Sequence, residues 1–166
     1  MALVPSLDES DLRKLVSLQG WEVSDFLVAD LSLQLVRGHC KINVHRDSFS
    51  QVLQSSDLLL CMAGTATEQA VGLGKPVVQL PGFGPQFTAA FAEAQRRLLG
   101  PTVFCANGKV GEEVNLRNTG KLMLEILQRS QSDSALKIDC NQEALRRLGP
   151  SGGAQRMANA ISNLLY

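Results

Sequence analysis

The residues best placed to do chemistry in this chain are Gly64-Thr65-Ala66-Thr67-Glu68. They follow a run of bulky apolar residues, Leu58–Met62, which ends at Ala63. A helix that begins here would present free backbone amides and a partial positive charge, which together favour phosphate binding. The carboxylate of Glu68 could accept hydrogen bonds from the two hydroxyls of a ribose. The segment is therefore a candidate nucleotide site.

The same five residues also have a purely structural interpretation. A threonine followed three residues later by a glutamate is the pattern of a capping box. Thr65 would be the N-cap and accept from the Glu68 amide, while the Glu68 carboxylate would accept from the Thr65 amide. Such a cap is worth about 0.5–2 kcal/mol and needs no ligand. Spacing alone leaves both interpretations open.

A second junction of the same kind follows the next apolar run. Leu80–Gln86 is rich in proline and glycine and leads into a helical pattern. The carboxyl ends of neighbouring parallel strands meet at one edge of a sheet, where α/β proteins bind their ligands. We therefore expect the two loops to lie side by side and to form a ligand cradle.

Alternating strand and helix patterns must position these loops. Short apolar runs predict strands near 2–4, 33–36, 41–44, 57–61, 77–80 and 102–105, of which 57–61 should be buried. Helical patterns cover about 6–18, 49–53, 65–73, 86–99, 114–129, 133–148 and 153–165. On the helix over 86–99, the residues Phe87, Ala90, Phe91, Ala94 and Leu98 fall on one face, and the apolar stripes of the last three helices should be core.

This alternation predicts an α/β fold. We expect a Rossmann-like, mostly parallel sheet with helices on both faces, followed by a helical C-terminal part with three helices over about 113–165. The length of 166 residues suits a single domain over 1–166.

Composition narrows the function classes. Sixteen basic residues balance sixteen acidic ones, so charge gives no indication of a nucleic-acid or membrane partner. No apolar run approaches the roughly 20 residues of a transmembrane helix, and the start of the chain does not resemble a signal or transit peptide. The four cysteines form no C-x-x-C pair and have no zinc spacing. We expect reduced, mostly buried thiols in a reducing compartment, the cytoplasm or plastid stroma.

The string Asp57–Leu59 followed by Ala63–Glu68 resembles the nucleotide-sugar site of lipid-A-disaccharide synthase and its relatives. The longer stretch AGTATEQAVGLGKPVVQLPGFGPQFTAAFAEAQRRLLG is similar to a cyanobacterial and plant-type branch of that family. The resemblance is specific from about Phe49 to Gly100 and looser elsewhere. Members are GT-B glycosyltransferases, in which two Rossmann-like domains face one another.

The resemblance implies that this chain is the C-terminal, donor-binding half of such an enzyme, truncated at its N-terminus. Glu68 would bind the ribose hydroxyls, Gly64-Thr65-Ala66-Thr67 would lie along the donor phosphates and sugar, and Gln86 would contact the donor sugar. UDP-sugar would be a substrate, and neither a cofactor nor a metal is expected.

The acceptor site and catalytic base of the family belong to an N-terminal domain that the chain lacks, so we expect no transfer by the chain alone. The alternative is a non-catalytic interaction subunit. It would pair with a separate acceptor-binding chain, form a homo-oligomer, or regulate a full-length homologue.

Overall fold

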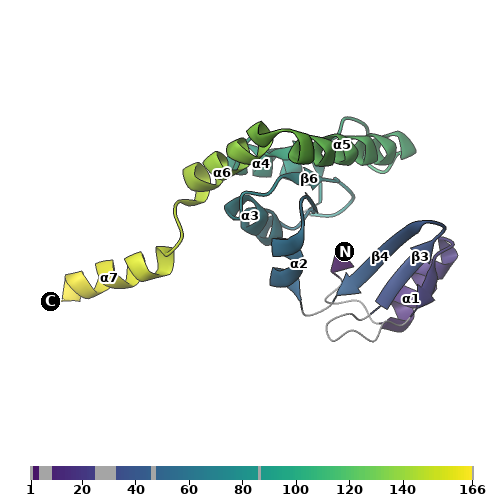
Figure 1. Ribbon diagram of the computed structural model, residues 1–166, viewed down its shortest axis with the longest axis horizontal. Helices are drawn as coiled ribbons and strands as arrows, with labels where there is room; N and C mark the ends of the chain where they lie inside the picture. The colour runs from purple at the N-terminus through teal and green to yellow at the C-terminus, as the bar shows by residue number, and fades with distance from the viewer. Residues whose placement is uncertain (1, 4–8, 25–32, 46–47, 86, 166) are drawn as a thin grey trace. The chain divides into compact units, whose positions relative to one another are not determined.

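A computed structural model of the chain describes residues 2–3, 9–24, 33–45, 48–85 and 87–165. The chain divides into two compact units, residues 1–56 and 57–166. Figure 1 labels helices and strands of both units. The predicted organisation as a single domain stays a prediction.

The first unit is built around a four-stranded sheet. Its elements are β1 (Ala2–Leu3), α1 (Glu9–Leu18), β2 (Glu22–Ser24), β3 (Leu33–Arg37), β4 (Cys40–His45) and α2 (Phe49–Ser55). The strand order is β1-β4-β3-β2. Leu12 of α1 packs with Leu33, Leu35 and Val44 of the sheet, so that one face of the sheet carries this unit's core.

The first unit corrects the expectation of one mostly parallel sheet. Only β1 and β4 run parallel, whereas β2–β3 and β3–β4 are antiparallel. The reason is the loop between β3 and β4, in which Arg37 pairs with Cys40 and only Gly38 and His39 make the turn. Gly38 has φ 58°, as the first central residue of a tight hairpin requires. A parallel connection would need a dozen residues or more.

The second unit contains a separate three-stranded sheet. Its elements are β5 (Leu59–Leu60), α3 (Gly64–Gly72), β6 (Val77–Gln79), α4 (Ala89–Leu99), β7 (Val103–Cys105), α5 (Glu113–Ser132), α6 (Ser134–Leu148) and α7 (Gly153–Leu165). The order is β5-β6-β7 and both pairs are parallel. The chain is thus a mixed α/β protein, and among the residues that the structure describes, parallel pairing occurs in this small sheet and in the β1–β4 pair.

Within the described residues, β6 is the central strand and β5 is at an edge. All three residues of β6 are buried. By contrast, Leu60 is 46% exposed and Leu59 is half-buried, so the prediction of a buried strand over 57–61 was wrong. Central position, not apolar composition, decides which strand is covered on both sides.

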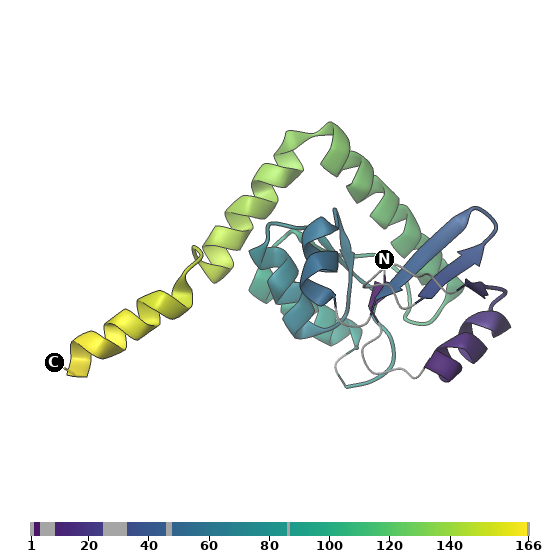
Figure 2. The ribbon, with the colours of Figure 1, turned by 60° about the horizontal axis from the view of Figure 1, so that its bottom comes forward.

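Helices pack against this sheet. Val78 shares a core with Ile126 of α5 and with Leu136 and Cys140 of α6. Val77 points to the opposite face because strand side chains alternate, and α3 contacts the same strand. Figure 2 shows α5 and α6 meeting at an angle. Asp133 ends α5 and caps α6, accepting from the Ala135 amide at 2.8 Å.

Two expectations about apolar helix faces were wrong. Helix α4 buries Ala92, Gln95 and Leu99, while Ala90, Ala94 and Leu98 of the predicted face are exposed. The spacing of apolar residues alone does not indicate this buried stripe, because Gln95 within it is polar. The stripes of α5 and α6 do contribute to the core, but α7 exposes all of its large apolar side chains that the structure describes: Met157, Ile161 and Leu164.

The cysteines also differ from expectation. All four are free thiols. Only Cys140 is buried, Cys61 is half-buried, and Cys40 and Cys105 are exposed. Short strands at sheet edges and strand ends leave these apolar runs partly open to solvent.

Candidate functional site

Helix α3 begins earlier than the capping-box interpretation requires. Its N-cap is Ala63 and its first residue is Gly64, and no side chain caps it. The first backbone hydrogen bond of the helix runs from the Thr67 amide to the Ala63 carbonyl, at 3.0 Å. Thr65 is therefore inside the first turn and cannot be the N-cap, so the capping box is absent. The amides of Gly64, Thr65 and Ala66 precede that first bond and have no acceptor within the helix.

The structure places the predicted site residues in different environments. Thr65 and Glu68 are exposed, and Gly64 and Ala66 are half-buried. Thr67 is fully buried and its hydroxyl donates to the Ala63 carbonyl at 2.9 Å. Thr67 thus stabilises the turn from inside, while Thr65 and Glu68 face solvent. Gln86 lies outside the described residues.

A buried pair of amide side chains supports the first turn of α3. Gln79 ends β6 and is fully buried, and its Nε2 donates to Oε1 of Gln95 on α4. A Cβ at Gly64 would lie 3.0 Å from Nε2 of Gln95. The absence of a side chain at Gly64 is what allows α3 to begin this close to α4. The turn is therefore held by strand, helix and glycine together.

The second predicted loop leaves the neighbouring strand at the same edge. Because β5 and β6 are parallel neighbours, their carboxyl ends open on the same side, as expected. In the loop, the Gly82 amide donates to the Phe87 carbonyl at 2.6 Å and the Phe87 amide to the Gly84 carbonyl at 3.2 Å. Thr88 then caps α4, accepting from the Phe91 amide at 3.1 Å.

A third loop at this edge was not anticipated as part of the site. It follows β7, and a cavity of about 270 Å³ lies there, lined by Cys105, Ala106, Asn107, Asn118, Lys121, Leu122 and Glu125. Asn115 is buried beside it, and its Oδ1 has no hydrogen-bond partner. Partial burial, together with the charge of Glu93, raises the pKa of the Cys105 thiol. The sequence signal that was available is the turn Asn107-Gly108 directly after a strand.

The chemical groups at this edge of the sheet are mainly backbone amides and small side chains. Among the described residues, no group of three or more His, Cys, Asp or Glu side chains could hold a metal ion. What the edge provides is a set of backbone amides at α3, small side chains around them and an exposed carboxylate one turn further along. Anionic groups are stabilised at such a helix start by its free amides and its dipole.

Comparison of the chain with protein-family models, curated proteins and solved structures finds no match. The fold defines a class only: a mixed α/β protein with a small parallel three-stranded sheet. In the described part of the chain, no helix is both long enough and apolar enough to cross a membrane.

Proposed function

We propose that this chain binds the UDP-sugar donor of a glycosyltransferase resembling lipid-A-disaccharide synthase, at the first turn of α3. The observation that supports this proposal is the helix start at Gly64. Its first amides have no helical acceptor, it follows a parallel strand, and an exposed Glu68 lies one turn further along.

Each site residue has a role in this proposal. The diphosphate accepts from the amides of Gly64, Thr65 and Ala66, and Glu68 accepts from the ribose hydroxyls. Thr67 positions the turn from the protein interior through its bond to Ala63. Gln86 contacts the donor sugar. The proposal assigns donor binding to this chain and assigns the transfer step to none of its residues.

A UDP titration followed by amide NMR shifts tests the proposal. Wild type should bind with a dissociation constant on the order of millimolar, about −4 kcal/mol, with shifts centred on residues 63–68 and 81–85. Glu68→Ala should abolish these shifts, while Gln69→Ala, which removes an exposed side chain from the same helix, should leave them unchanged. Thermal melts of both variants establish that they are folded. A folded wild type without shifts would exclude donor binding.

A second candidate function is a non-catalytic interaction subunit. It is favoured by large apolar side chains exposed on three helices: Leu98 of α4, Ile138 and Leu145 of α6, and Met157, Ile161 and Leu164 of α7. Exposed apolar surface of this kind is typical of association sites. Oligomerisation seen by light scattering, in a chain that shows no UDP shifts, would favour this function over the first.

A further inference from the structure

A second cavity lies away from the carboxyl edge of the sheet, where the chain enters β7. It has a volume of about 310 Å³ and is lined by Pro101, Thr102, Phe104, Arg129, Leu136, Asp139, Gln142 and Glu143. Pro101 and Thr102 precede β7, so the cavity is at the amino end of that strand. Its volume is at the lower end of the range for small-molecule sites, roughly 300–1,000 Å³.

The cavity contains a buried polar group that the protein does not satisfy. Thr102 is only 3% exposed, and its Oγ1 has no hydrogen-bond partner. A buried hydroxyl without a partner destabilises the folded chain. Oγ1 of Thr102 is itself closed to solvent, so it makes the cavity wall polar without lying on the surface that a ligand meets.

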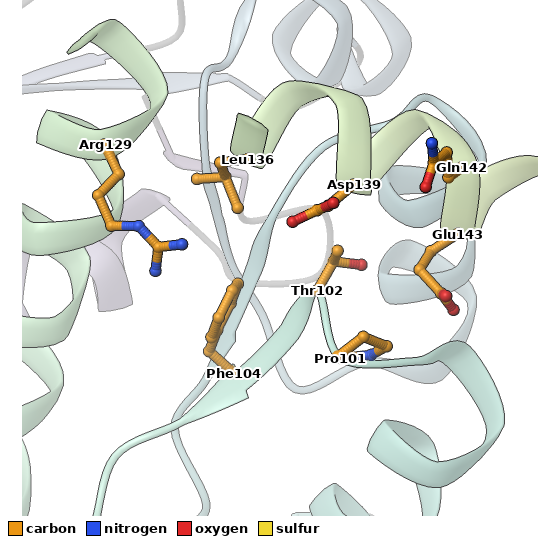
Figure 3. Close-up of a pocket in the computed structure, with 8 residues that line it drawn as sticks. All are labelled: Pro101, Thr102, Phe104, Arg129, Leu136, Asp139, Gln142 and Glu143. Atoms are coloured by element: carbon orange, nitrogen blue, oxygen red, sulfur yellow. The ribbon is translucent and has the colours of Figure 1, made fainter. Parts of the chain in front are cut away.

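Opposite charges line the two sides of the cavity. Figure 3 shows the Arg129 guanidinium entering from α5 and the Asp139 carboxylate entering from α6, each directed toward the space between the two helices. Among the described residues, neither side chain forms an ion pair or a side-chain hydrogen bond. Both charges are therefore available to a ligand.

Glu143 differs from Asp139 in being already neutralised. Its carboxylate is 3.0 Å from Nε of Arg147 and 3.3 Å from Nη1 of Arg146. The charges left for a ligand are thus one cation, Arg129, and one anion, Asp139. On the Asp139 side, the side-chain amide of Gln142 adds a further acceptor (Figure 3).

We propose that this cavity binds a small zwitterion, namely a free amino acid. Its carboxylate pairs with Arg129, and its ammonium donates to Asp139. The hydrocarbon part packs against Pro101, Phe104 and Leu136. A phosphate or other plain anion fits less well, because Asp139 would repel it, and a plain cation would be repelled by Arg129.

The test is an amide NMR titration of the full chain with leucine, β-alanine and γ-aminobutyrate, which vary the separation between ammonium and carboxylate. One of them should shift amides of residues 101–104 and 136–143 in a saturable manner below about 10 mM. The matched controls for leucine are N-acetyl-leucine, which lacks the ammonium, and leucinamide, which lacks the carboxylate. For the other two, the N-acetyl and amide forms serve in the same way. Each control should bind about tenfold more weakly or worse.

Three variants assign the contacts. Arg129→Gln and Asp139→Asn should each weaken binding about tenfold, while Arg117→Gln, on the exposed side of the same helix α5, should leave it unchanged. Thr102→Val should leave binding unchanged and raise the melting temperature of the free protein, because it removes a buried hydroxyl without a partner. The proposal is overturned if none of the three amino acids shifts these amides, or if the N-acetyl and amide forms bind as tightly as the parent.

Discussion

Gln79 and Gln95 form a buried side-chain hydrogen bond that joins the end of β6 to the middle of α4. Both residues are less than a tenth exposed. The Gln95 amide nitrogen is also the atom that a side chain at Gly64 would meet first. The start of α3, where the candidate donor site lies, therefore depends on two polar residues that take no part in the chemistry proposed there.

Gly64→Ala tests this dependence. The added Cβ would be 3.0 Å from Nε2 of Gln95. The Gln95 side chain is held in place because its Oε1 accepts a hydrogen bond from Gln79. Overpacking of this kind costs about 1–3 kcal/mol. The matched control is Gly120→Ala within α5, where a Cβ meets nothing within 4 Å and the change should stabilise by about 0.5–1 kcal/mol. Urea denaturation measures both, and equal stabilisation of the two variants would contradict the close packing at Gly64.

Removing both partners of the amide pair should destabilise the protein by less than the two single removals added together. Gln95→Leu leaves Gln79 buried without its acceptor, a loss of about 1–3 kcal/mol. The double variant Gln79→Leu, Gln95→Leu has no orphaned group, so its loss should be smaller than the sum of the two single losses. A double-mutant cycle in urea gives the coupling energy, expected in the range of about 0.5–3 kcal/mol for residues in contact. Strict additivity would show that the pair does not stabilise the fold.

Stability should fall in acid through two carboxylates. Hydrogen bonds from Arg96 and Arg97 lower the pKa of Glu93 to about 2, and the hydrogen bond from Arg147 lowers the pKa of Glu143. A depressed folded-state pKa contributes stability above the unfolded value, about 4.3, and that contribution is lost as pH falls through the folded value. Urea midpoints between pH 6 and pH 2 should therefore decline in wild type.

Glu143→Gln should decline less steeply over the same pH range, since it has no carboxylate left to protonate at that position. Glu113→Gln is the control, because Glu113 and its partner Arg117 are largely exposed. It should follow the wild-type curve. A wild-type urea midpoint that rises toward pH 2 would contradict the predicted loss of stability in acid.

Cys140 should resist alkylation while the other cysteines react. It is 1% exposed, and burial together with the charge of Asp139 raises its pKa to about 11. At pH 8 roughly one Cys140 thiol in a thousand would be a thiolate. Mass spectrometry after iodoacetamide treatment should find modification at Cys40, Cys61 and Cys105 in the folded chain, and at all four in urea. Modification of Cys140 as fast as Cys40 would show that Cys140 is not buried in the core that it shares with Val78 and Ile126.

The parallel part of the fold could be predicted because its signals are local. The apolar runs around Val77–Gln79 and Val103–Cys105 alternate with helical patterns, and parallel pairing follows from the crossover helices between them. The antiparallel hairpin was missed although Gly38-His39 between two apolar runs is a hairpin signal. Depth of burial was harder to predict, because it depends on where a strand stands in its sheet.

The helix start that carries the candidate site was predictable to within a residue, and the site itself stays a prediction. The strand end and the small residues indicated a helix near Gly64–Glu68, whereas its exact first residue showed that the capping box is absent. Helix boundaries shift by one or two residues with small changes in tertiary packing, here the approach of α4 at Gln95. The second cavity had no sequence signal, since Arg129 and Asp139 belong to different helices and Thr102 to a third segment.

The side of the second unit opposite the candidate donor site depends on contacts to glycines. A Cβ at Gly100 would lie 2.2 Å from the Glu143 carboxylate, and one at Gly74 would lie 2.2 Å from Oδ1 of Asn141. Helix α6 thus packs closely against Gly74 and Gly100, the glycines that follow α3 and α4. Both glycines also have positive φ, 98° at Gly100 and 66° at Gly74, a conformation that a side chain strains. In evolutionary terms, shortening residue 143 or 141 would remove the contact but not this strain, so we expect both positions to stay glycine in descendants of this chain.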